Sequence, residues 1–450
     1  MLSKSKFTRG INCQKSLWLY VHNFEARAVS EATASLFGTG INVGDLAREY
    51  FPNGVMAVEG DYPNRQSAQR TQELIAQGVE TIYEATFIYN DTLVAVDLMH
   101  KQNGRWSLYE VKSTNSVKPQ HIKDVAVQYY VVQGSGLELE DAYLMHFDRE
   151  YVKRGAIVPT QLFKAESLLE QVLAVQSTIA VNIELFQNML LGDEPEVLMG
   201  IQCKKPYECD FCEYCSCLPC NQKENAEAIE LSTEHQVQPS KIQDFVQGLE
   251  YPICHLDFET IMPAVPMFDE SRPYQQIPFQ YSLHTQQHPD SEIIHSDYLA
   301  ESNPDIDPRL DLITQMIAET AEAKTVLVYN LRFERDRIQE MMRDFPLYAA
   351  TLQTIIDRMK DLMHPFQKKH YTTEALGRKY SIKLVLPMLC PDVSYNELEI
   401  NNGMDASSKF LNLYYCPDET LIAETRHHLL KYCHLDTLAM VKILEVLQGV

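Results

Sequence analysis

The sequence predicts an α/β protein with two domains, and three observations support this. Apolar patterns typical of strands alternate with patterns typical of helices in both halves of the chain, as they do in α/β domains. Around residues 221–248 the stretch NQKENAEAIELSTEHQVQPSK is polar and free of aromatic residues, which indicates a linker. A length of 450 residues corresponds to roughly two to three domains. We therefore expect domains at residues 1–225 and 249–450, joined by a linker at 226–248.

The first half is expected to begin with helices and to continue with a β-sheet. Strands are indicated where β-branched and aromatic residues gather, and Asn103 and Gly104 lie where a hairpin turn is expected. Glu170 and Glu184 interrupt an apolar stretch at intervals that indicate an amphipathic helix. The predicted elements are helices at about Leu17 to Tyr50, Arg65 to Gln77, His121 to Gln133 and Ala165 to Leu190, and strands at residues 80–90, 92–101, 106–113 and 142–147.

The second half is expected to open with a buried strand, because PICHLDFE is a short apolar run that ends in carboxylates. Strand and helix patterns then alternate to the end of the chain. The predicted elements are strands at residues 252–259, 281–286 and 325–330, and helices at Pro308 to Ala323, Phe333 to Asp344 and within Pro417 to Leu447.

Composition restricts the classes of function. The chain is 45% hydrophobic and 22% charged, which is ordinary for a globular protein, and it has no apolar run of about 18 residues that would span a membrane. The basic N-terminal stretch has no apolar core behind it, so we expect no signal peptide, no membrane partner and a cytoplasmic location. A net charge of −23 argues against a protein that holds nucleic acid by bulk charge. It is compatible with a metal-dependent nuclease, which needs carboxylates at its centre.

Asp97, Glu110 and Lys112 form the first group of candidate catalytic residues. Asp97 lies on one predicted strand and Glu110 on the next, and Glu110 and Lys112 are two residues apart, so they share a face of their strand. Two carboxylates can hold Mg²⁺ or Mn²⁺, and a lysine beside them can orient or activate the attacking water. The polar face of an edge hairpin would give the same triplet, so the triplet alone leaves both interpretations open.

The segment that contains this triplet resembles the PD-(D/E)XK nuclease superfamily, and within it the RecB-like branch. The motifs of that branch run Asp, then Glu-x-Lys, then a helix with Gln and Tyr, and Asp97, Glu110, Lys112 and Gln128 fall on those positions. The resemblance implies a restriction-endonuclease-like core that hydrolyses phosphodiester bonds, with Asp97 and Glu110 as metal ligands.

The segment departs from that branch at two positions. The branch usually has Gln-x-x-x-Tyr, whereas residue 132 is Val, so the tyrosine role passes to Tyr129 or Tyr130. Many members also supply a metal-binding His from Gly-x-x-x-His, but the corresponding stretch, residues 40–44, ends in glycine. Glu84 is the best local substitute, and a solvated strand glutamate is the alternative interpretation of that residue.

Six of the 11 cysteines lie between Cys203 and Cys220. In a chain expected to remain in the cytoplasm, this clustering indicates metal or iron-sulfur ligation rather than disulfides. The two Cys-x2-Cys pairs are only four residues apart, whereas a zinc ribbon separates its pairs by about 15 to 20 residues. Zinc is therefore a poor match. Cys13 is a further thiol at the opposite end of the same domain.

A lone N-terminal thiol together with a cysteine cluster just past the core resembles the iron-sulfur RecB-like nucleases. The spacing is also similar to that of an uncharacterised bacterial family in which such a nuclease half is fused to a second domain. This resemblance implies a four-iron-four-sulfur cluster, which needs four thiolates, held by Cys13, Cys203, Cys209 and Cys215. The expected role of the cluster is structural, because it would join the first helix of the domain to its last segment.

The other cysteines of the cluster compete with this assignment to different extents. Cys212 is the main competitor for a ligand position, whereas Cys217 and Cys220 are expected to be bystanders.

The second half carries carboxylates in an order that indicates a metal site. Asp257 and Glu259 are two apart on the first predicted strand, and burying two carboxylates on one face is costly unless a cation neutralises them. Glu334 lies in the first turn of a helix, and Tyr432 and Asp436 are four apart on one helical face. An ordinary surface pair is the alternative for Tyr432 and Asp436 taken alone.

Asp-x-Glu, then Asn-x2-Phe-acid, then Tyr-x3-Asp resemble in order the three exonuclease motifs of the DEDD class, tyrosine subtype. The resemblance implies an RNase H-like fold, removal of nucleotides from a 3′ end, two metals held by carboxylates, and a tyrosine that positions the water. The second motif normally ends in Asp, where this chain has Glu334. We expect Asp257, Glu259 and Asp436 to converge on the metal pair, with Glu334 approaching the same site and the Tyr432 hydroxyl directed toward the water.

Lys368, Lys369, Arg378, Lys379 and Lys383 alternate with Tyr371 and Tyr380 between the second and third motifs. They indicate a path for a single strand or, alternatively, a solvated loop.

The expected partner is nucleic acid, with DNA favoured, single-stranded or with a free end. Two other hypotheses stay open. In one, only one domain cuts and the other grips nucleic acid. In the other, both folds serve as a non-catalytic adaptor.

Overall fold

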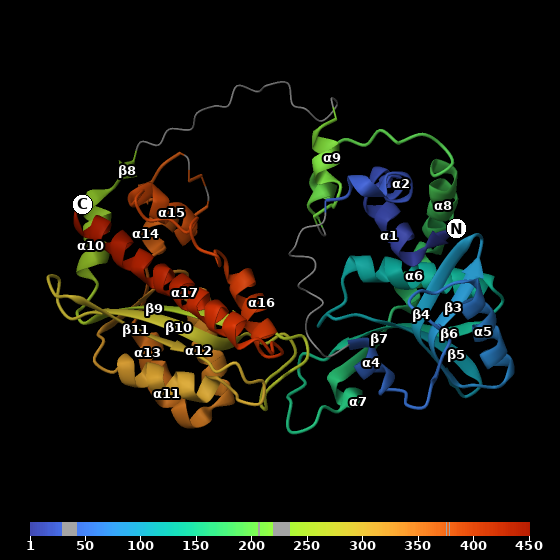
Figure 1. The fold of residues 1–450 in the computed structure, drawn as a ribbon, viewed down its shortest axis with the longest axis horizontal. Helices are drawn as coiled ribbons and strands as arrows, with labels where there is room; N and C mark the ends of the chain where they lie inside the picture. The colour runs from blue at the N-terminus through green and yellow to red at the C-terminus, as the bar shows by residue number, and fades with distance from the viewer. Residues whose placement is uncertain (29–42, 206–207, 219–234, 375, 378) are drawn as a thin grey trace. The chain divides into compact units, whose positions relative to one another are not determined.

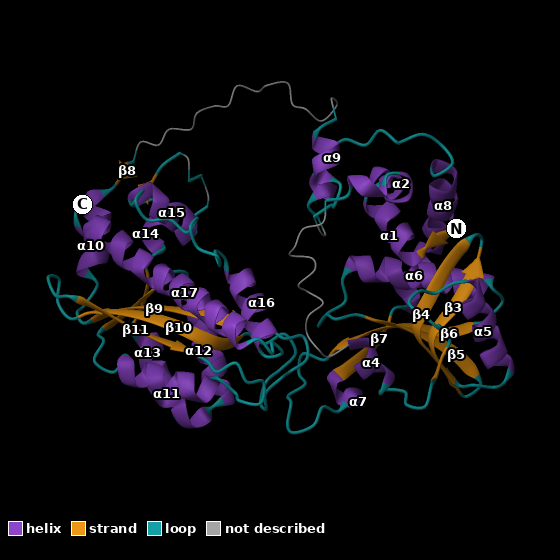
Figure 2. Cartoon of the chain, viewed as in Figure 1, coloured by secondary structure: helices purple, strands orange, loops and turns teal. Residues whose placement is uncertain are grey.

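The computed structural model describes residues 1–28, 43–205, 208–218, 235–374, 376–377 and 379–450. The chain divides into two compact units, Met1–Ala226 and Glu227–Val450, and each contains helices and a main β-sheet (Figures 1 and 2). The protein is therefore a mixed α/β protein. None of the helices that the structure describes is both long and apolar enough to cross a bilayer.

The main sheet of the first unit has seven strands in the order β2-β3-β4-β5-β6-β7, and β1 pairs with β4. β3, β4 and β5 are antiparallel neighbours, whereas β6 runs parallel to β5. The strands are β1 (Leu2–Ser3), β2 (Val55–Met56), β3 (Thr81–Tyr89), β4 (Thr92–Gln102), β5 (Arg105–Val111), β6 (Leu139–Phe147) and β7 (Phe163–Ser167).

Helices of the first unit pack on this sheet through a core of aliphatic side chains. Val127 and Val131 of α6 are fully buried, as are Ile82 and Val94 of the strands beneath. The described helices are α1 (Lys4–Asn12), α2 (Gln14–His22), α4 (Val43–Arg48), α5 (Arg65–Ala76), α6 (Pro119–Gly134), α7 (Pro159–Leu162), α8 (Leu169–Met189) and α9 (Cys212–Ser216), with 3-10 turns at Phe24–Ala26 and Ile201–Cys203.

The β4–β5 hairpin forms as predicted. Gln102 pairs with Arg105, and both intervening residues have left-handed backbone angles, with φ of 54° at Asn103 and 81° at Gly104. Asn and Gly adopt this conformation at low cost, so they favour the tight turn that sets the register of the two strands.

The main sheet of the second unit has five strands in the order β11-β10-β9-β12-β13. β9, β10 and β11 are antiparallel, whereas β12 and β13 continue parallel to β9. The strands are β9 (Ile253–Ile261), β10 (Ile277–Gln286), β11 (Ile293–Leu299), β12 (Thr325–Val328) and β13 (Met359–Asp361), and β8 (Gln236–Val237) pairs with β14 (Tyr371–Thr372) in a separate ribbon.

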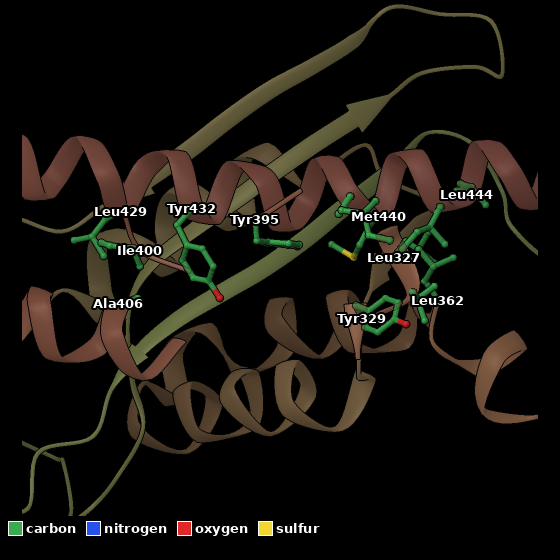
Figure 3. Close-up of a cluster of buried hydrophobic side chains, with 14 of the residues drawn as sticks. Leu327, Tyr329, Leu362, Tyr395, Ile400, Ala406, Leu429, Tyr432, Met440 and Leu444 are labelled. Carbon is green, nitrogen blue, oxygen red and sulfur yellow. The ribbon is translucent and has the colours of Figure 1, made fainter. Parts of the chain in front are cut away.

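Helices cover both faces of this five-stranded sheet (Figure 1). α17 crosses one face and α11 to α13 cover the other, so the core consists of two clusters. Figure 3 shows part of the α17 cluster, in which Tyr395 and Tyr432 lie among Leu429, Ile400 and Met440. The helices are α10 (Pro239–Gln247), α11 (Arg309–Glu319), α12 (Leu331–Asp344), α13 (Ala349–Asp357), α14 (His364–Gln367), α15 (Ile382–Leu389), α16 (Gly403–Leu413) and α17 (Glu419–Gln448), with a 3-10 turn at Pro346–Tyr348.

One predicted helix differs from the structure at its start. The helix expected from Ala165 begins only at Leu169, because Phe163–Ser167 pairs with β6 as strand β7. The helices expected within Leu17 to Tyr50 correspond to α2 and α4, and residues 29–42 lie outside the described part.

The expected linker also differs over its second half. Residues 219–234 lie outside the described part, but β8 and α10 occupy residues 236–247, where Pro239 provides a favourable helix start. α10 packs against α17, and Ile242 is fully buried there. Polar composition therefore did not identify a short amphipathic helix.

Candidate functional site

The centre of the second unit is a set of carboxylates on β9, the middle strand of its sheet. Successive side chains of a strand point to opposite faces. Leu256 and Phe258 enter the core cluster beneath α11 and α12, and Asp257 and Glu259 therefore point to the α17 face. Glu259 is only 7% exposed and Asp257 is partly buried, so both carboxylates have limited contact with water.

α17 brings the third motif onto the same face. Tyr432 and Asp436 lie one turn apart and both are buried, with exposed fractions of 3% and 6%. Carboxylate oxygens of Asp257, Glu259 and Asp436 all lie within 4.8 Å of one another. The structure thus brings Asp436 next to two carboxylates that precede it by almost 180 positions in the sequence.

Glu334 enters this site from the first turn of α12. Its side chain is 2% exposed, and its Oε2 atom is buried without a hydrogen-bond partner. Burial raises its pKa well above the usual value, and the charges of Asp257 and Glu259 raise it further. The extra methylene of glutamate therefore does not exclude this carboxylate from the cluster.

The negative charges of these carboxylates repel one another. Burial raises the pKa of Asp257 well above its usual value, and the neighbouring Asp436 adds to this effect. The pKa of Glu259 is raised by burial and by both aspartates, and burial raises that of Asp436 to about 6. Ionised carboxylates so close together in low dielectric repel strongly unless a cation lies between them. The oxygen-only donor set fits Mg²⁺ or Mn²⁺.

Tyr395 was not singled out from the sequence, and Lys383 was singled out only as part of the basic path. The Tyr395 hydroxyl donates a hydrogen bond of 2.7 Å to Asp436 Oδ1, and Lys383 Nζ donates one of 3.0 Å to the Tyr432 hydroxyl. Lys383 also lies over both tyrosine rings, at 5.2 Å from Tyr395 and 4.8 Å from Tyr432. No periodic signal marks Tyr395, because it lies in an irregular segment.

The predicted basic path is only partly available for stacking on nucleic acid. Tyr371 is 6% exposed, and its hydroxyl forms a hydrogen bond with His235 Nδ1. Its ring therefore belongs to the core. Lys383 is engaged at the carboxylate site, and Arg378 lies outside the described residues. Lys369 remains exposed.

The first unit gathers its predicted residues around Glu110. Glu110 is 1% exposed and accepts hydrogen bonds from Lys112, whose Nζ lies 2.8 Å from Oε1, and from Gln128 Nε2. Asp97 Oδ2 accepts a 2.6 Å hydrogen bond from the backbone N–H of Val111, next to Glu110. The Glu-x-Lys pair therefore lies on one face, as its spacing predicted.

Lys4 completes this site and was not identified from the sequence. Its Nζ lies 2.8 Å from each oxygen of Glu110. β1 pairs with β4 and leads directly into α1, so the N-terminal strand positions this lysine. Asp124 of α6 holds the other lysine, with its Oδ2 3.0 Å from Lys112 Nζ.

The two acids of the first unit have opposite shifts. Burial alone would raise the pKa of Glu110, but the ammonium groups of Lys4 and Lys112 outweigh it and hold the pKa at about 2. The charge of Lys4 lowers the pKa of Asp97, but burial together with the charge of Glu110 outweighs this effect and raises the pKa to about 8. A divalent ion here would share Glu110 with two lysines that already neutralise it.

Glu84 lies beside this site in a strained conformation. The β3–β4 register passes from Tyr83 to Ala85 without pairing Glu84, whose φ is +52°. Residues held in this region are uncommon and gather at functional sites. Its charge raises the pKa of Asp97, and its Oε1 atom lies 3.6 Å from Arg48 Nη2.

The remaining residues of the first resemblance are placed as follows. Gly44 belongs to α4, and Gly40 lies outside the described residues. The hydroxyls of Tyr129 and Tyr130 accept hydrogen bonds from Gln133 and Asn90 respectively.

Five cysteines line one cavity between α2 and the segment that ends the first unit. They are Cys13, Cys203, Cys209, Cys212 and Cys215. Burial raises the pKa of the Cys13 thiol, and the nearby sulfurs of Cys209 and Cys203 raise it further. Cys217 is exposed, and Cys220 lies outside the described residues. The cavity brings the N-terminal thiol to the distant cluster and contains one thiol more than a four-iron-four-sulfur cluster requires.

The cysteine segment is also held to α1 by an ion pair. The two terminal guanidinium nitrogens of Arg9 donate hydrogen bonds to the Asp210 carboxylate, at 2.7 and 3.1 Å. Asp210 directly follows Cys209, so this ion pair holds the cysteine segment against α1.

The fold and these sites can be set beside known proteins. Residues 254–381, which include Asp257, Glu259 and Glu334, match a family model described as "Domain of unknown function (DUF2779)". The chain is similar to the "Uncharacterized protein MG366 homolog" of Mycoplasma pneumoniae, with 30% identity over 227 residues, covering 45% of this chain and 33% of that protein.

Two further relatives cover similar shares. "Uncharacterized protein MG366" of Mycoplasma genitalium is 26% identical over 231 residues, which is 46% of this chain and 34% of that protein. "Uncharacterized protein UU173" of Ureaplasma parvum is 28% identical over 223 residues, covering 44% and 32% respectively. The chain spans about a third of the length of these relatives.

The carboxylate cluster of the second unit predicts a coupled dependence on pH and divalent metal. A carboxylate whose pKa is raised on folding takes up a proton, so without metal the free energy of unfolding should fall as pH rises from about 4 through the raised values, the first near 6 for Asp436. Mg²⁺ or Mn²⁺ should reverse this loss at pH 8, by about 2.7 kcal/mol at a hundredfold excess over the dissociation constant. Thermal unfolding in EDTA and in Mn²⁺ measures both effects.

Asp257→Asn should flatten this pH dependence and remove most of the Mn²⁺ effect, whereas Asp290→Asn in the exposed β10–β11 turn should change neither. An equal Mn²⁺ effect in wild type and Asp257→Asn would contradict this assignment.

The Lys4–Glu110 pair predicts a stability change that depends on acid pH. Lys4→Met should lower the free energy of unfolding by about 1.5–3 kcal/mol at neutral pH, the range for hydrogen bonds to charged groups. The pKa of Glu110 is lowered on folding, so this contribution is present above about 4.5 and is lost as pH falls toward about 2. Denaturant titrations at several pH values measure the difference.

Lys123→Met, at an exposed position on α6, is the matched control and should have little effect. In a Glu110→Gln background the cost of Lys4→Met should largely disappear, and an undiminished cost would show that Lys4 acts through other contacts.

Proposed function

We propose that this chain is a metal-dependent nuclease that hydrolyses phosphodiester bonds of nucleic acid, with DNA as the favoured substrate. The observation that carries the proposal is the meeting of Asp257, Glu259 and Asp436, whose oxygens lie within 4.8 Å of one another, with Glu334 beside them. The order of these residues resembles the DEDD exonuclease class, and the convergence of the side chains is what that class requires.

The chemistry of the second unit follows from these groups. Asp257, Glu259 and Asp436 would hold Mg²⁺ or Mn²⁺, with Glu334 as a further ligand, and such metals activate a water and stabilise the leaving oxygen. The Tyr432 hydroxyl lies one helical turn from Asp436 and is fixed by Lys383. It can orient a water toward the scissile phosphate. Tyr395 fixes Asp436 through its hydroxyl and so keeps that carboxylate in place.

The fold supports this proposal. Three antiparallel strands followed by two parallel ones, with β9 in the middle, are compatible with an RNase H-like fold. In the first unit, a β3–β4–β5 meander followed by α6 and the parallel strand β6 is compatible with a restriction-endonuclease-like core. We propose that the first unit is a RecB-like nuclease domain that works on the same substrate.

A second candidate is that only the second unit cuts and the first grips nucleic acid. The observation that favours it is the state of Glu110, which already has two lysines and Gln128 as partners. A metal must compete with these donors, whereas the carboxylates of the second unit have mainly each other as neighbours. The two candidates differ in whether unit-one variants lose activity.

The nuclease proposal predicts losses specific to each site. With Mn²⁺ and end-labelled DNA, Asp257→Ala should eliminate the stepwise product ladder from the 3′ end because it removes a metal ligand. Tyr432→Phe should slow the reaction by roughly 10- to 100-fold, as expected for a group that orients a water but does not bind the metal. Glu334→Asp should preserve or raise activity. Gel assays on single- and double-stranded DNA and RNA, with Asp290→Ala as the control, measure these effects.

Asp97→Asn and Lys112→Ala report on the first unit in the same assays. Loss of a second, ladder-independent cleavage would support two active sites, whereas unchanged cleavage with weaker binding would support the gripping role. Full activity of Asp257→Ala and Asp97→Asn alike, in correctly folded protein, would overturn the nuclease proposal.

We also propose that the cysteine cavity holds a four-iron-four-sulfur cluster with a structural role. The cavity gathers thiols from α2's N-terminal edge and from the last described segment of the first unit, as a cluster that joins these parts needs. Burial and the neighbouring thiols raise the pKa values of Cys13 and Cys212, and the positive charge of bound iron would offset both effects and stabilise the thiolates. Cys13, Cys203, Cys209 and Cys215 are the assigned ligands, with Cys212 as the competitor.

This assignment predicts that protein purified without oxygen is brown and contains close to four irons and four sulfides per chain. Cys13→Ala should lose both and destabilise the first unit, while the exposed Cys217→Ala should retain them. Comparison of Cys212→Ala with Cys215→Ala identifies the fourth ligand. Iron and sulfide analysis with visible absorption provides the measurement, and stoichiometric zinc without iron would show that the cluster assignment is wrong.

A further inference from the structure

A row of histidines crosses the sheet of the second unit away from the proposed catalytic residues. His284 of β10 pairs directly with His295 of β11 on one side and with His255 of β9 on the other. Directly paired residues of neighbouring strands point to the same face of a sheet, so the three imidazoles lie side by side. α17 crosses this face and adds His434.

Three of these rings form a compact group. The ring centroids are separated by 4.6 Å for His284 and His295, 4.8 Å for His284 and His434, and 4.3 Å for His295 and His434. One ring nitrogen from each lies within 4.8 Å of the others. Three imidazole nitrogens at this spacing can converge on a single ion, since Zn²⁺ binds histidine nitrogen at about 2.0–2.1 Å.

Hydroxyl groups hold two of the rings in fixed orientations. Thr437 Oγ1 lies 2.8 Å from His284 Nδ1, and Ser282 Oγ lies 3.0 Å from His295 Nε2. The two hydroxyls also bond each other at 2.6 Å. A histidine that binds a metal usually bonds a polar group through its other nitrogen, which fixes the ring. His284 thus keeps its Nε2 for a ligand.

The surroundings favour neutral imidazoles and add a carboxylate. Burial, together with the neighbouring His295 and His434, lowers the pKa of His284 to about 3, so its ring is neutral at pH 7 with a lone pair available. Burial lowers the pKa of His295 and His434 in the same direction. Asp297 Oδ2 lies 3.9 Å from His295 Nδ1 and is partly exposed.

We propose that His284, His295 and His434 form a transition-metal site, most suited to Zn²⁺, that is separate from the carboxylate site. Three imidazoles with a carboxylate or water as the fourth ligand make a common zinc donor set, and Asp297 is the carboxylate in place to serve. The partial exposure of His295 and Asp297 gives the ion access from solvent.

The ligands come from β10, β11 and α17, so the ion joins the last helix to the edge of the sheet. α17 also carries Tyr432, two residues before His434, and Asp436, two residues after it. A metal at His434 therefore fixes the axial position and rotation of the helix turn from which both proposed catalytic side chains extend. The role of the site is to position that helix.

Zinc binding to the full chain tests the proposal. Protein purified without oxygen and stripped with EDTA is titrated with Zn²⁺ alone, and bound zinc is counted by elemental analysis after dialysis. Wild type should bind one more tight Zn²⁺ per chain than His434→Ala, and His427→Ala, an exposed histidine on the same helix, should behave as wild type. Asp257→Asn should keep this Zn²⁺, which separates it from the carboxylate site.

Thr437→Val provides a milder variant that keeps every ligand. Loss of a group that orients a ligand typically lowers metal affinity about 10- to 100-fold, and this drop is expected here with unchanged stoichiometry at saturating Zn²⁺. Zn²⁺ should also raise the melting temperature of wild type and His427→Ala but not of His434→Ala. Circular dichroism and iron content check that each variant is folded.

Equal zinc stoichiometry and affinity in wild type, His434→Ala and Thr437→Val would overturn the proposal. Loss of zinc only in Cys13→Ala would also overturn it, because the ion would then belong to the cysteine cavity.

Discussion

The second unit depends on one constraint, which is that several carboxylates are buried on one face of its central strand. Asp257 and Glu259 lie on β9 between Ile253 and Ile261, on the face that α17 crosses. Glu259 is buried and Asp257 is partly buried, so water screens their charges only weakly. Lys383 is the cation that lowers the pKa of all three clustered acids, and it does not offset their repulsion. The fold therefore holds a charge arrangement that is favourable only when protons or metal ions are bound.

Hydrophobic packing around the carboxylates stabilises the fold that holds them. Phe258 and Leu256 point away from the carboxylates into the core beneath α11 and α12. On the other face, Leu429 and Met440 of α17 belong to the same hydrophobic cluster as Tyr395 and Tyr432 (Figure 3). Burying such side chains contributes roughly 1.5–3 kcal/mol each. The hydrophobic clusters on both faces of the sheet thus fix the positions of Asp257 and Asp436.

The sequence predicted those parts of the site that follow a local rule. Spacing of two on a strand placed Asp257 with Glu259, and Glu110 with Lys112, and spacing of four on a helix placed Tyr432 with Asp436. Helix and strand patterning located long elements such as β3, β4, β9, α6 and α17, but it missed shorter ones such as β1, β7 and α10, whose patterns span few residues. Lys4, Tyr395 and the His284–His295 pair depend on register across strands or on irregular segments, and no local periodicity encodes either.

Both units bury carboxylates, but the charges of these groups are neutralised to different extents. This difference bears on the roles of the two units. In the first unit Glu110 has its counter-charges built in, because Lys4 and Lys112 lower its pKa to about 2 despite complete burial. In the second, burial raises the pKa of every member of the cluster, and neighbouring acids add to the shifts of Asp257, Glu259 and Glu334. Lys383 opposes these shifts without cancelling them. A site whose acids are already paired with cations gains less from binding a metal than a site in which most of the repulsion is left. The proposed divalent metal would therefore relieve more repulsion in the second unit, whereas in the first it would have to displace an existing partner.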